Sequence, residues 1–291
     1  MSDRDQLHRF LFEKHNIRGE FVQLDATWQA VLEGSDYPEP VRDLLGQAMA
    51  ASALLTATIK FEGRLTLQAQ GDGPVRMLVV QAGSDGTLRG LARWEGEVGP
   101  ASLAELFGSG QLAITIEPRE GQRYQGIVPL EGEDLGAALR HYFDSSEQLP
   151  TRLWLAAGES VAAGLLIQQL PSESGEDDRD AWNRVLQLAS TISEDELREL
   201  DVRTLLHRLF HEEDVRLFEP EPVSFRCNCS REKTAATLRN VGEAEIRPLL
   251  EEQEMVEVTC EFCGTTHRFD AVDVEEIFAE AGHAPGPGRV Q

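Results

Sequence analysis

The chain has 291 residues, a length that is large for one domain and comfortable for two. Hydrophobic residues make up 41% of it and charged residues 27%, which is the composition of an ordinary globular protein. The net charge is −24, from 27 basic and 51 acidic residues. Because phosphate contacts supply most of the affinity for DNA or RNA, a chain without a basic cluster is not expected to bind nucleic acid.

The start of the chain has no signal-peptide pattern, and the longest weakly polar run, residues 48–59, is too short to span a bilayer. We therefore expect a cytoplasmic protein that does not bind a membrane. Only Lys14, Lys60 and Lys233 are lysines, and the other basic residues are arginines. An acidic, lysine-poor surface stays soluble where salt screens its repulsion, so a salty cytoplasm is a further hypothesis.

Residues 1–171 are predicted to form one N-terminal domain of the α+β class. A long helix is expected over residues 38–59, because prolines mark its start and apolar residues recur on one face. The Asp85-Gly86 turn signal favours a hairpin. Strands are expected at residues 65–69, 75–80, 87–92, 112–117, 123–129, 152–156 and 161–168, and shorter helices at 101–107 and 133–147. Consecutive hairpins indicate a mostly antiparallel sheet with helices packed on it.

A helical linker, residues 172–219, is predicted to follow. It opens with the polar, acidic residues 172–178 and continues into two amphipathic helices, the second beginning at the capping box of Ser193 and Glu196. The linker is too short to bury its apolar stripe on itself. It either docks permanently on the main domain, which is the more common arrangement, or forms a reversible clamp. The sequence leaves both possibilities open.

Residues 220–282 are predicted to form a small third unit, and residues 283–291 a disordered tail rich in proline and glycine. Ser230 is a candidate helix N-cap, and a second helix is expected near residues 243–253. A hairpin around the last two cysteines and a final helix complete the unit. A fold of roughly 60 residues with few aromatic side chains is only marginally stable unless a bound metal or a disulfide cross-links it.

The four cysteines are grouped as Cys227-Asn228-Cys229 and Cys260-Glu261-Phe262-Cys263. In a reducing cytoplasm, such pairs are expected to bind metal or to take part in redox chemistry. Two pairs from separate segments commonly supply tetrahedral thiolate ligands for zinc, so we predict one Zn²⁺ bound by Cys227, Cys229, Cys260 and Cys263. His267 is a rival ligand, although four thiolates already complete such a site.

The one-residue spacer between Cys227 and Cys229 is unusual for a structural zinc site. On oxidation, these two sulfurs would close a small ring with little freedom to reach a good S–S torsion, so the bond should be easy to reduce. Spacing alone nevertheless favours a passive zinc module in an interaction protein. A thiol-disulfide oxidoreductase is a second alternative, although the Cys260-x-x-Cys263 pair lacks a thioredoxin-like βαβ context.

The sequence contains none of the common motifs of hydrolases, nucleotide-binding enzymes or catalytic zinc sites. A metal closed by four cysteines also has no open position for a catalytic water. We therefore predict that the protein is not an enzyme.

At these positions the chain resembles the bacterial redox-regulated holdase family, the heat-shock protein of 33 kDa. That family has a C-x-C pair followed, after a longer spacer, by C-x-x-C, and this chain has both pairs. Similarity extends through the N-terminal domain, to Asn16-Ile17-Arg18-Gly19-Glu20, Asp25-Ala26-Thr27-Trp28, Lys60-Phe61-Glu62-Gly63 and Gln70-Gly71-Asp72-Gly73-Pro74. It covers nearly the whole chain apart from the tail.

The resemblance implies an ATP-independent chaperone that is inactive while reduced and zinc-bound. Peroxide with heat, or hypochlorous acid, would form the disulfides Cys227–Cys229 and Cys260–Cys263 and release the zinc, with the second pair sensing the oxidant. The zinc domain and linker would then unfold. The active form, often a homodimer, would hold unfolded client proteins and pass them to ATP-dependent chaperones once reducing conditions return.

Overall fold

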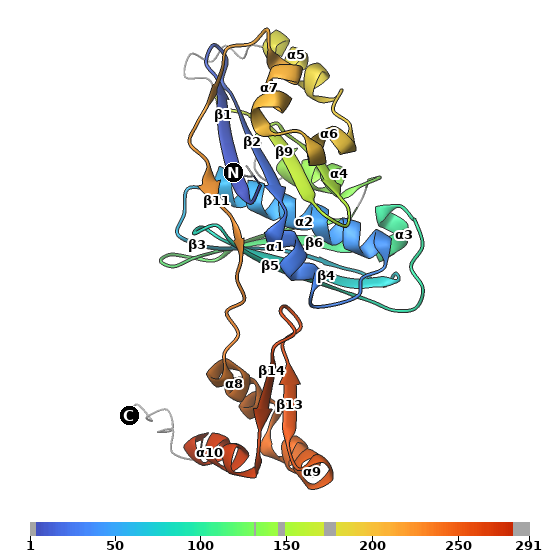
Figure 1. Cartoon of the computed structure of the whole chain (residues 1–291), viewed down its shortest axis with the longest axis vertical. Coiled ribbons are helices and arrows are strands. Elements are labelled where there is room, and N and C mark those ends of the chain that lie inside the picture. Colours follow the sequence, from blue (N-terminus) through green and yellow to red (C-terminus); the bar gives the residue numbers. More distant parts are fainter. Residues whose placement is uncertain (1–3, 131, 145–148, 172–178, 282–291) are drawn as a thin grey trace, which may run out of the picture. The chain divides into compact units, whose positions relative to one another are not determined.

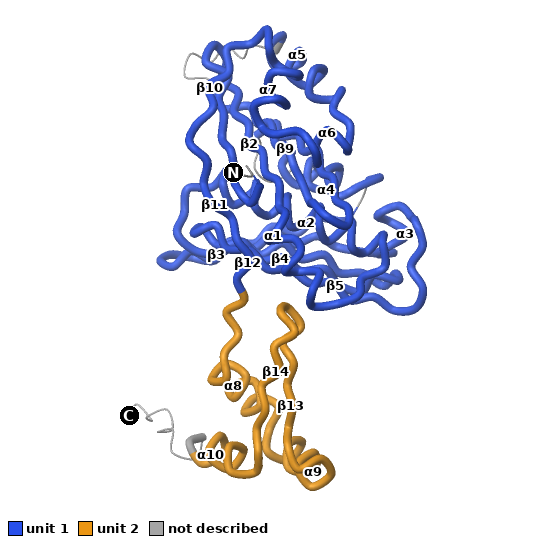
Figure 2. The backbone as a smooth tube through the Cα atoms, viewed as in Figure 1, with its two compact units in different colours: residues 1–226 blue, residues 227–291 orange. Residues whose placement is uncertain are grey.

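The computed structural model describes residues 4–130, 132–144, 149–171 and 179–281. Its contacts divide the chain after Arg226 into unit 1 (Met1–Arg226) and unit 2 (Cys227–Gln291), which are coloured separately in Figure 2. The predicted acidic segment 172–178, the tail 283–291 and the end of the predicted helix 133–147 lie outside the described residues. The predicted α+β class with mostly antiparallel strand pairing is confirmed, and the strands of the N-terminal domain form two large sheets where one was expected.

Unit 1 contains two sheets of six described strands each, antiparallel throughout except for one short pair (Figure 1). Sheet A has the order β10 (Val215–Leu217), β1 (Gln6–Phe12), β2 (Ile17–Leu24), β9 (Ala162–Gln169) and β8 (Thr151–Ala157), with β11 (Glu221–Pro222) also beside β1. Sheet B has the order β12 (Ser224–Phe225), β5 (Thr87–Trp94), β4 (Val75–Gly83), β3 (Gly63–Gln70), β6 (Gln111–Pro118) and β7 (Tyr124–Pro129). The parallel pair is β12 with β5.

The long helix α2 (Glu39–Thr58) lies between the two sheets and contacts strands of both (Figure 1). It is therefore buried nearly all round, and not only on the face that the sequence pattern indicates. The close approach requires small residues. A Cβ atom at Gly46 would lie 2.6 Å from the Cβ of Ala157, and one at Gly164 would lie 2.8 Å from Cδ1 of Leu54. The main hydrophobic core surrounds this helix.

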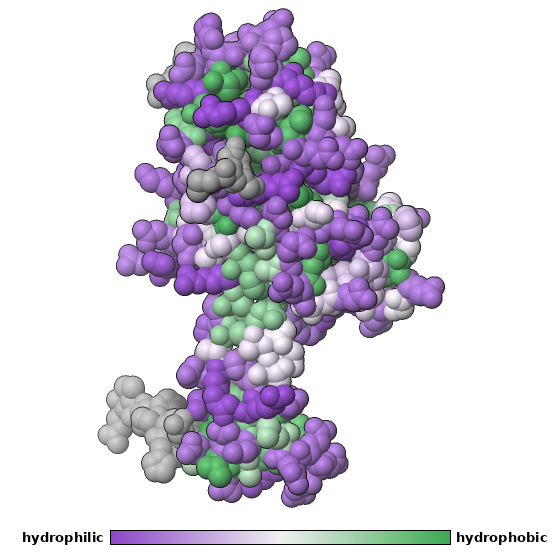
Figure 3. All heavy atoms as spheres, in the orientation of Figure 1, coloured by the Kyte–Doolittle hydropathy of each residue, from purple (hydrophilic) through white to green (hydrophobic). Residues whose placement is uncertain are grey.

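The predicted strands of the N-terminal domain are present as β3 to β9, with small differences at their ends. The sequence reading missed β1, β2 and the short helix α1 (Ala26–Leu32). Both strands contain charged residues, Arg9 in β1 and Arg18 and Glu20 in β2, and these interrupt the apolar pattern. The remaining helices of the domain are α3 (Leu103–Phe107) and α4 (Leu135–Tyr142). On the face shown in Figure 3, hydrophilic residues cover most of the surface of unit 1. No helix of the described residues is long and apolar enough to cross a membrane.

The second face of sheet A is covered by α5 (Arg179–Ala189), α6 (Glu194–Glu199) and α7 (Val202–Phe210) (Figure 1). The second predicted linker helix is thus two helices. Leu200 is extended, and the Asp201 side chain starts α7 by accepting hydrogen bonds from the backbone N–H groups of Arg203 and Thr204. The predicted Ser193–Glu196 capping box is present at the start of α6.

A second hydrophobic cluster lies between these three helices and sheet A. Phe210 of α7 meets Phe12 of β1 edge to face, with ring centroids 5.0 Å apart. The helices contribute Trp182, Val185, Leu205, Leu209 and Phe210, and the sheet contributes Phe10, Phe12, Phe21, Leu165 and Ile167. In the structure, the apolar stripe of the linker is therefore docked.

Two polar contacts fix the position of this helical layer. The buried amide of Gln23 in β2 donates hydrogen bonds of 3.0 Å to the carbonyl oxygens of Leu197 and Leu200, at the end of α6. Arg184 of α5 donates to Glu213, with 2.6 Å between Nε and Oε1. Leaving a buried polar group without its partner costs about 1–3 kcal/mol. These contacts therefore add specificity to the apolar docking.

Unit 2 contains α8 (Arg231–Val241), α9 (Glu243–Gln253), the hairpin β13 (Val256–Thr259) and β14 (Thr266–Phe269), and α10 (Ala271–Ala281). Ser230 caps α8 as predicted, accepting a hydrogen bond from the N–H of Lys233. The core is small, and Phe269 is its largest fully buried side chain. The cluster consists of Ala235, Leu238, Ile246, Val256, Phe269, Val274 and Ile277.

Truncation of Phe210 should loosen the helical layer selectively. Phe210→Ala removes a buried ring from the contact with Phe12, and such changes cost about 3–5 kcal/mol. We expect faster amide hydrogen exchange in α5, α6 and α7, measured by mass spectrometry, with sheet B unchanged. Arg203→Ala, on the exposed face of the same helix, is the control. An equal increase throughout unit 1 would contradict a separately held layer.

Candidate metal centre

The four cysteine sulfurs of unit 2 converge on one point, and all lie within 4.8 Å of one another. Cys227 Sγ is 3.6 Å from Cys260 Sγ, and Cys229 Sγ is 3.5 Å from Cys263 Sγ. A tetrahedral zinc site with Zn–S bonds of ~2.3 Å places its sulfurs ~3.8 Å apart. A disulfide requires ~2.05 Å, so the four cysteines are free, and these two sulfur–sulfur distances are close to those of a zinc site. The chain therefore has a cluster close enough to bind a metal ion.

The second cysteine pair lies on the tight turn that joins β13 to β14. The backbone N–H groups of Cys263 and Gly264 both donate to the carbonyl of Cys260, and the N–H of Cys260 donates to the carbonyl of Thr265. Gly264 has a φ of +68°, a conformation that side chains disfavour. The turn thus holds the two cysteines close together, with their sulfurs in the four-cysteine cluster.

The first pair lies just before α8 and is tied to that helix. Lys233 Nζ donates a hydrogen bond of 2.6 Å to the carbonyl of Asn228, the spacer residue. Arg231 pairs with Asp273 of α10 at 2.6 Å and lies over the ring of Phe269, with 4.5 Å from its Cζ to the ring centroid. These contacts join the segment of the first pair to the hairpin and to α10. Sequence reasoning missed them, because only the ligands have a recognisable spacing.

The surroundings shift the pKa values of three of the thiols. Burial raises the pKa of Cys229, and hydrogen bonds with the neighbouring thiols act in the same direction. Burial also raises the pKa of Cys260. At Cys263 burial acts in that sense too, but hydrogen bonds from the Thr265 side chain and backbone outweigh it and lower the pKa to about 7. All four side chains are partly exposed, so small oxidants have access to them.

His267, the rival ligand, does not join the cluster. It lies on β14 opposite Val258, and the described metal-ligand group contains the four cysteines alone. Together, the fold and the site define a class of protein: an α+β protein with a helical layer over one sheet and a small unit built around four cysteines.

Comparison with known proteins gives the family. The model of the Hsp33 protein family matches residues 5–270. The 33 kDa chaperonin of Nitrosococcus oceani is 55% identical over 285 residues, which are 98% of each chain. That of Pseudomonas aeruginosa is 48% identical over 297 residues and covers the whole of both chains. The chain belongs to the Hsp33 family. The names of these relatives are those of a chaperone, which supports the prediction that the protein is not an enzyme.

The fold has a solved counterpart. The crystal structure of the 33 kDa chaperonin from Thermotoga maritima matches with a TM-score of 0.84 at 23% sequence identity. The match covers 97% of this chain and all of the other. It shows that the fold persists where most residues have changed.

The ligand set can be tested by counting metal. The reduced protein should contain one Zn²⁺ per chain by elemental analysis. Cys263→Ser should lower this content and destabilise α8 to α10, because it removes one of four ligands. His267→Ala should retain the metal, since His267 lies outside the cluster. Loss of zinc in the histidine variant, or full zinc in the serine variant, would refute the four-cysteine site.

Proposed function

We propose that this protein is a redox-regulated, ATP-independent holdase, inactive while its four cysteines bind zinc and active after they are oxidised. The observation that carries the proposal is the convergence of four sulfurs within 4.8 Å in a unit with a very small core, in a chain of the Hsp33 family. A zinc tetrathiolate requires reduced cysteines, which favours the cytoplasm as the place of action.

Zinc binding would account for most of the stability of unit 2. Cys227, Cys229, Cys260 and Cys263 offer soft thiolate ligands, the donor set that zinc prefers. When bound, the metal supplies cross-linking and keeps the sulfurs as thiolates. Structural zinc sites contribute about 10–16 kcal/mol of apparent binding energy at neutral pH, which is folding energy where the apo form does not fold. Seven mostly aliphatic buried residues cannot replace that contribution.

Oxidation would convert each pair of thiolates to a disulfide. Each pair gives two electrons to one peroxide molecule, which takes up two protons and leaves as two water molecules. We propose the Cys260–Cys263 pair as the sensor, because both cysteines lie on one short turn and their side chains are partly exposed. Oxidation at Cys260–Cys263 would remove two of the four ligands. The remaining pair, Cys227 and Cys229, would then bind the metal less tightly. The metal would then leave as Zn²⁺.

The choice of disulfide partners decides whether oxidation can open unit 2. Pairs across the segments, Cys227–Cys260 and Cys229–Cys263, would replace the metal by covalent staples. Pairs within each segment leave the two segments unconnected. We therefore propose Cys227–Cys229 and Cys260–Cys263 as the pairs of the active form, although the cross-segment sulfurs are only 3.6 and 3.5 Å apart.

Unfolding of unit 2 would reach the helical layer through the chain that joins them. Cys227 is two residues after β12, and both β12 and β11 are two-residue strands with few hydrogen bonds. Such short pairings open at little free-energy cost. Release of residues 215–225 would detach the support of α7, and the apolar faces of α5 to α7 and of sheet A would become available to clients. We propose this reversible docking for the linker, residues 172–219, between residues 1–171 and the switch domain, residues 220–282.

The partners follow from this mechanism. Unfolded or partly unfolded proteins would bind through apolar surface, with no need for a sequence-specific pocket. The same newly exposed surface would favour a homodimer of the oxidised form. On return to reducing conditions, clients would pass to ATP-dependent chaperones, because the holdase itself has no energy source for refolding.

The central test measures three quantities on one sample. Treatment with peroxide at raised temperature should release one zinc ion and remove all four thiols per chain. It should also switch on suppression of the aggregation of a thermally unfolding client. The variant with serine at all four cysteines is the control and should not respond to peroxide. The proposal fails if the oxidised, zinc-free protein leaves the client to aggregate as fast as in buffer. Oxidation that only inactivates would favour a passive zinc module, and steady turnover of a dithiol substrate would favour an oxidoreductase.

Mapping of the disulfides tests the partner choice separately. Digestion of the oxidised protein and mass spectrometry should recover Cys227–Cys229 and Cys260–Cys263 as intrapeptide links. Recovery of Cys227–Cys260 or Cys229–Cys263 as the main product in the active form would contradict the opening mechanism. The zinc-bound protein treated with a thiol-blocking reagent before digestion is the matched control and should contain neither link.

A further inference from the structure

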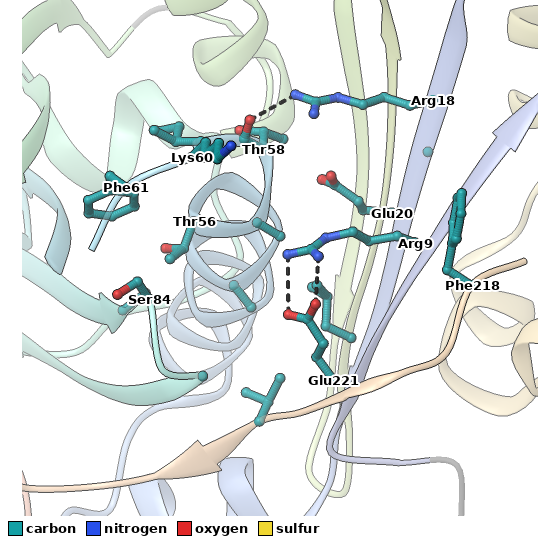
Figure 4. A pocket seen from close by; sticks show the side chains of 18 of the residues that line it. Arg9, Arg18, Glu20, Thr56, Thr58, Lys60, Phe61, Ser84, Phe218 and Glu221 are labelled. Carbon is teal, nitrogen blue, oxygen red and sulfur yellow. Dashed lines mark hydrogen bonds and ion pairs between the residues drawn. The ribbon is translucent and has the colours of Figure 1, made fainter. Parts of the chain in front are cut away.

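Unit 1 contains a cavity of about 500 Å³ that has no part in the proposed chemistry of the cysteines. It lies between β1 and β2, the C-terminal end of α2, the turn joining β4 to β5, and residues 218–223 (Figure 4). Sites for small molecules typically have volumes of ~300–1,000 Å³. Much of the lining is apolar and comes from Leu7, Ala53, Ala57, Ile59, Phe61 and Leu88.

Three charged side chains project from sheet A toward α2 on one wall of this cavity (Figure 4). Arg18 and Glu20 are two residues apart on β2, and Arg9 of β1 lies directly opposite Glu20 in the antiparallel register. The alternation of side chains along a strand therefore places all three on the same face. Arg9 donates to both carboxylate oxygens of Glu221, at 2.6 and 3.2 Å, and this pair is neutral overall.

The charge of Arg18 has no such partner among the described residues. Its guanidinium donates to the carbonyl of Thr58 at 2.9 Å and to Oε1 of Gln168 at 2.6 Å, and both acceptors are neutral. Lys60, beyond the end of α2, also lines the cavity, is exposed and pairs with no described carboxylate. In a chain with a net charge of −24, this cavity is thus locally basic.

Glu20 does not neutralise these cations fully. Its side chain is 1% exposed, and its Oε2 has no hydrogen-bond partner among the described residues. Burial raises the pKa of Glu20 to about 7, while Arg18 and Arg9 act in the opposite direction. Near neutral pH, the carboxyl is therefore partly protonated and can donate a hydrogen bond. The Nε of Arg9 is also buried and has no hydrogen-bond partner within the described part of the chain.

We propose that the cavity binds a small amphiphilic anion, an aliphatic carboxylate whose headgroup lies against Arg18 and Lys60 beside Glu20. Its chain would run along the apolar residues at the end of α2. A carboxylate supplies the missing negative charge and accepts charge-assisted hydrogen bonds from the two cations and a hydrogen bond from protonated Glu20. A cationic headgroup would meet Arg9 and Arg18, and a neutral one would leave the charge of Arg18 without a partner. The site does not take part in the redox chemistry of the cysteines, but residues 218–223, which line it, belong to the segment 215–225, so we expect it in the reduced form.

Isothermal titration of decanoate into the reduced, full-length, zinc-bound protein tests the site. We expect saturation at one molecule per chain. Affinity should rise about fourfold for each methylene added between octanoate and dodecanoate, as burial of a CH₂ group predicts. Acetate, decanol and decylammonium should bind at least tenfold more weakly. Equal binding of decylammonium would overturn the proposal. So would the absence of decanoate binding, which would leave ordered water as the occupant.

Two charge variants locate the headgroup. Lys60→Gln should weaken decanoate binding roughly tenfold, the loss expected for one charge-assisted hydrogen bond. Lys14→Gln removes the same charge from the exposed turn between β1 and β2 and should change the affinity less than twofold. Equal affinities in the two variants would overturn the placement.

The pH dependence tests the role of Glu20. Only the protonated carboxyl donates to the bound anion, so affinity should fall as the pH rises from 6 to 8, through the pKa of about 7. The other charged groups that face Glu20 are Arg9, Arg18, Lys60 and Glu221, whose side-chain types do not titrate in this range. Glu20→Gln keeps a donor and should make binding independent of pH. A pH dependence that persists in this variant would exclude Glu20 from the site.

Discussion

Sheet A has apolar side chains on both faces, and the architecture of unit 1 depends on keeping both of them covered. The two covers differ in kind. On one face α2 is a long helix, buried nearly all round, with small residues that let it approach both sheets closely. On the other face α5, α6 and α7 have 11, 6 and 9 residues. Isolated helices of that length are marginal in water, so their folding depends on docking. One cover is part of the main core, and the other packs on a separate hydrophobic cluster.

The stability of unit 2 would likewise depend on one component that can be removed, a metal ion bound by the four cysteines. Its core contains few residues, and its segments are joined by the cysteine cluster and by ion pairs such as Arg231–Asp273. Exposed ion pairs contribute little to stability in water. The contribution of a bound metal would exceed that of any other interaction in the unit, and a change in the chemical state of four sulfur atoms would act on the whole of it.

Much of this structure could be predicted from the sequence, and the omissions have physical causes. Strands β3 to β9 and the helix α2 were predictable because apolar periodicity and turn residues agree there. The four cysteines were predictable because ligand spacing is a local property. By contrast, β1 and β2 were missed, since Arg9, Arg18 and Glu20 place charge on a face that is buried only in the tertiary fold. The interruption of the helix at Leu200 was also missed. The apolar stripe continues through this residue, but the helical conformation of the backbone does not. The docking of the linker could not be predicted either. It depends on the apolar face of sheet A, whose strands are distant from the linker in the sequence.

The pairing of β1 with β10 and β11 joins the first strand of the chain to residues 215–222. Synthesis at ~5–20 residues per second delivers those residues roughly ten to forty seconds after β1. Until then, one edge of β1 has no partner strand, and the phenylalanine side chains of the first hairpin are not yet covered by α5 to α7. The nascent chain thus passes through a stage in which it exposes the kind of apolar surface that a chaperone recognises. The docking of α5 to α7 ends that stage, so the apolar surface of the first hairpin is covered by a part of the chain that is made much later.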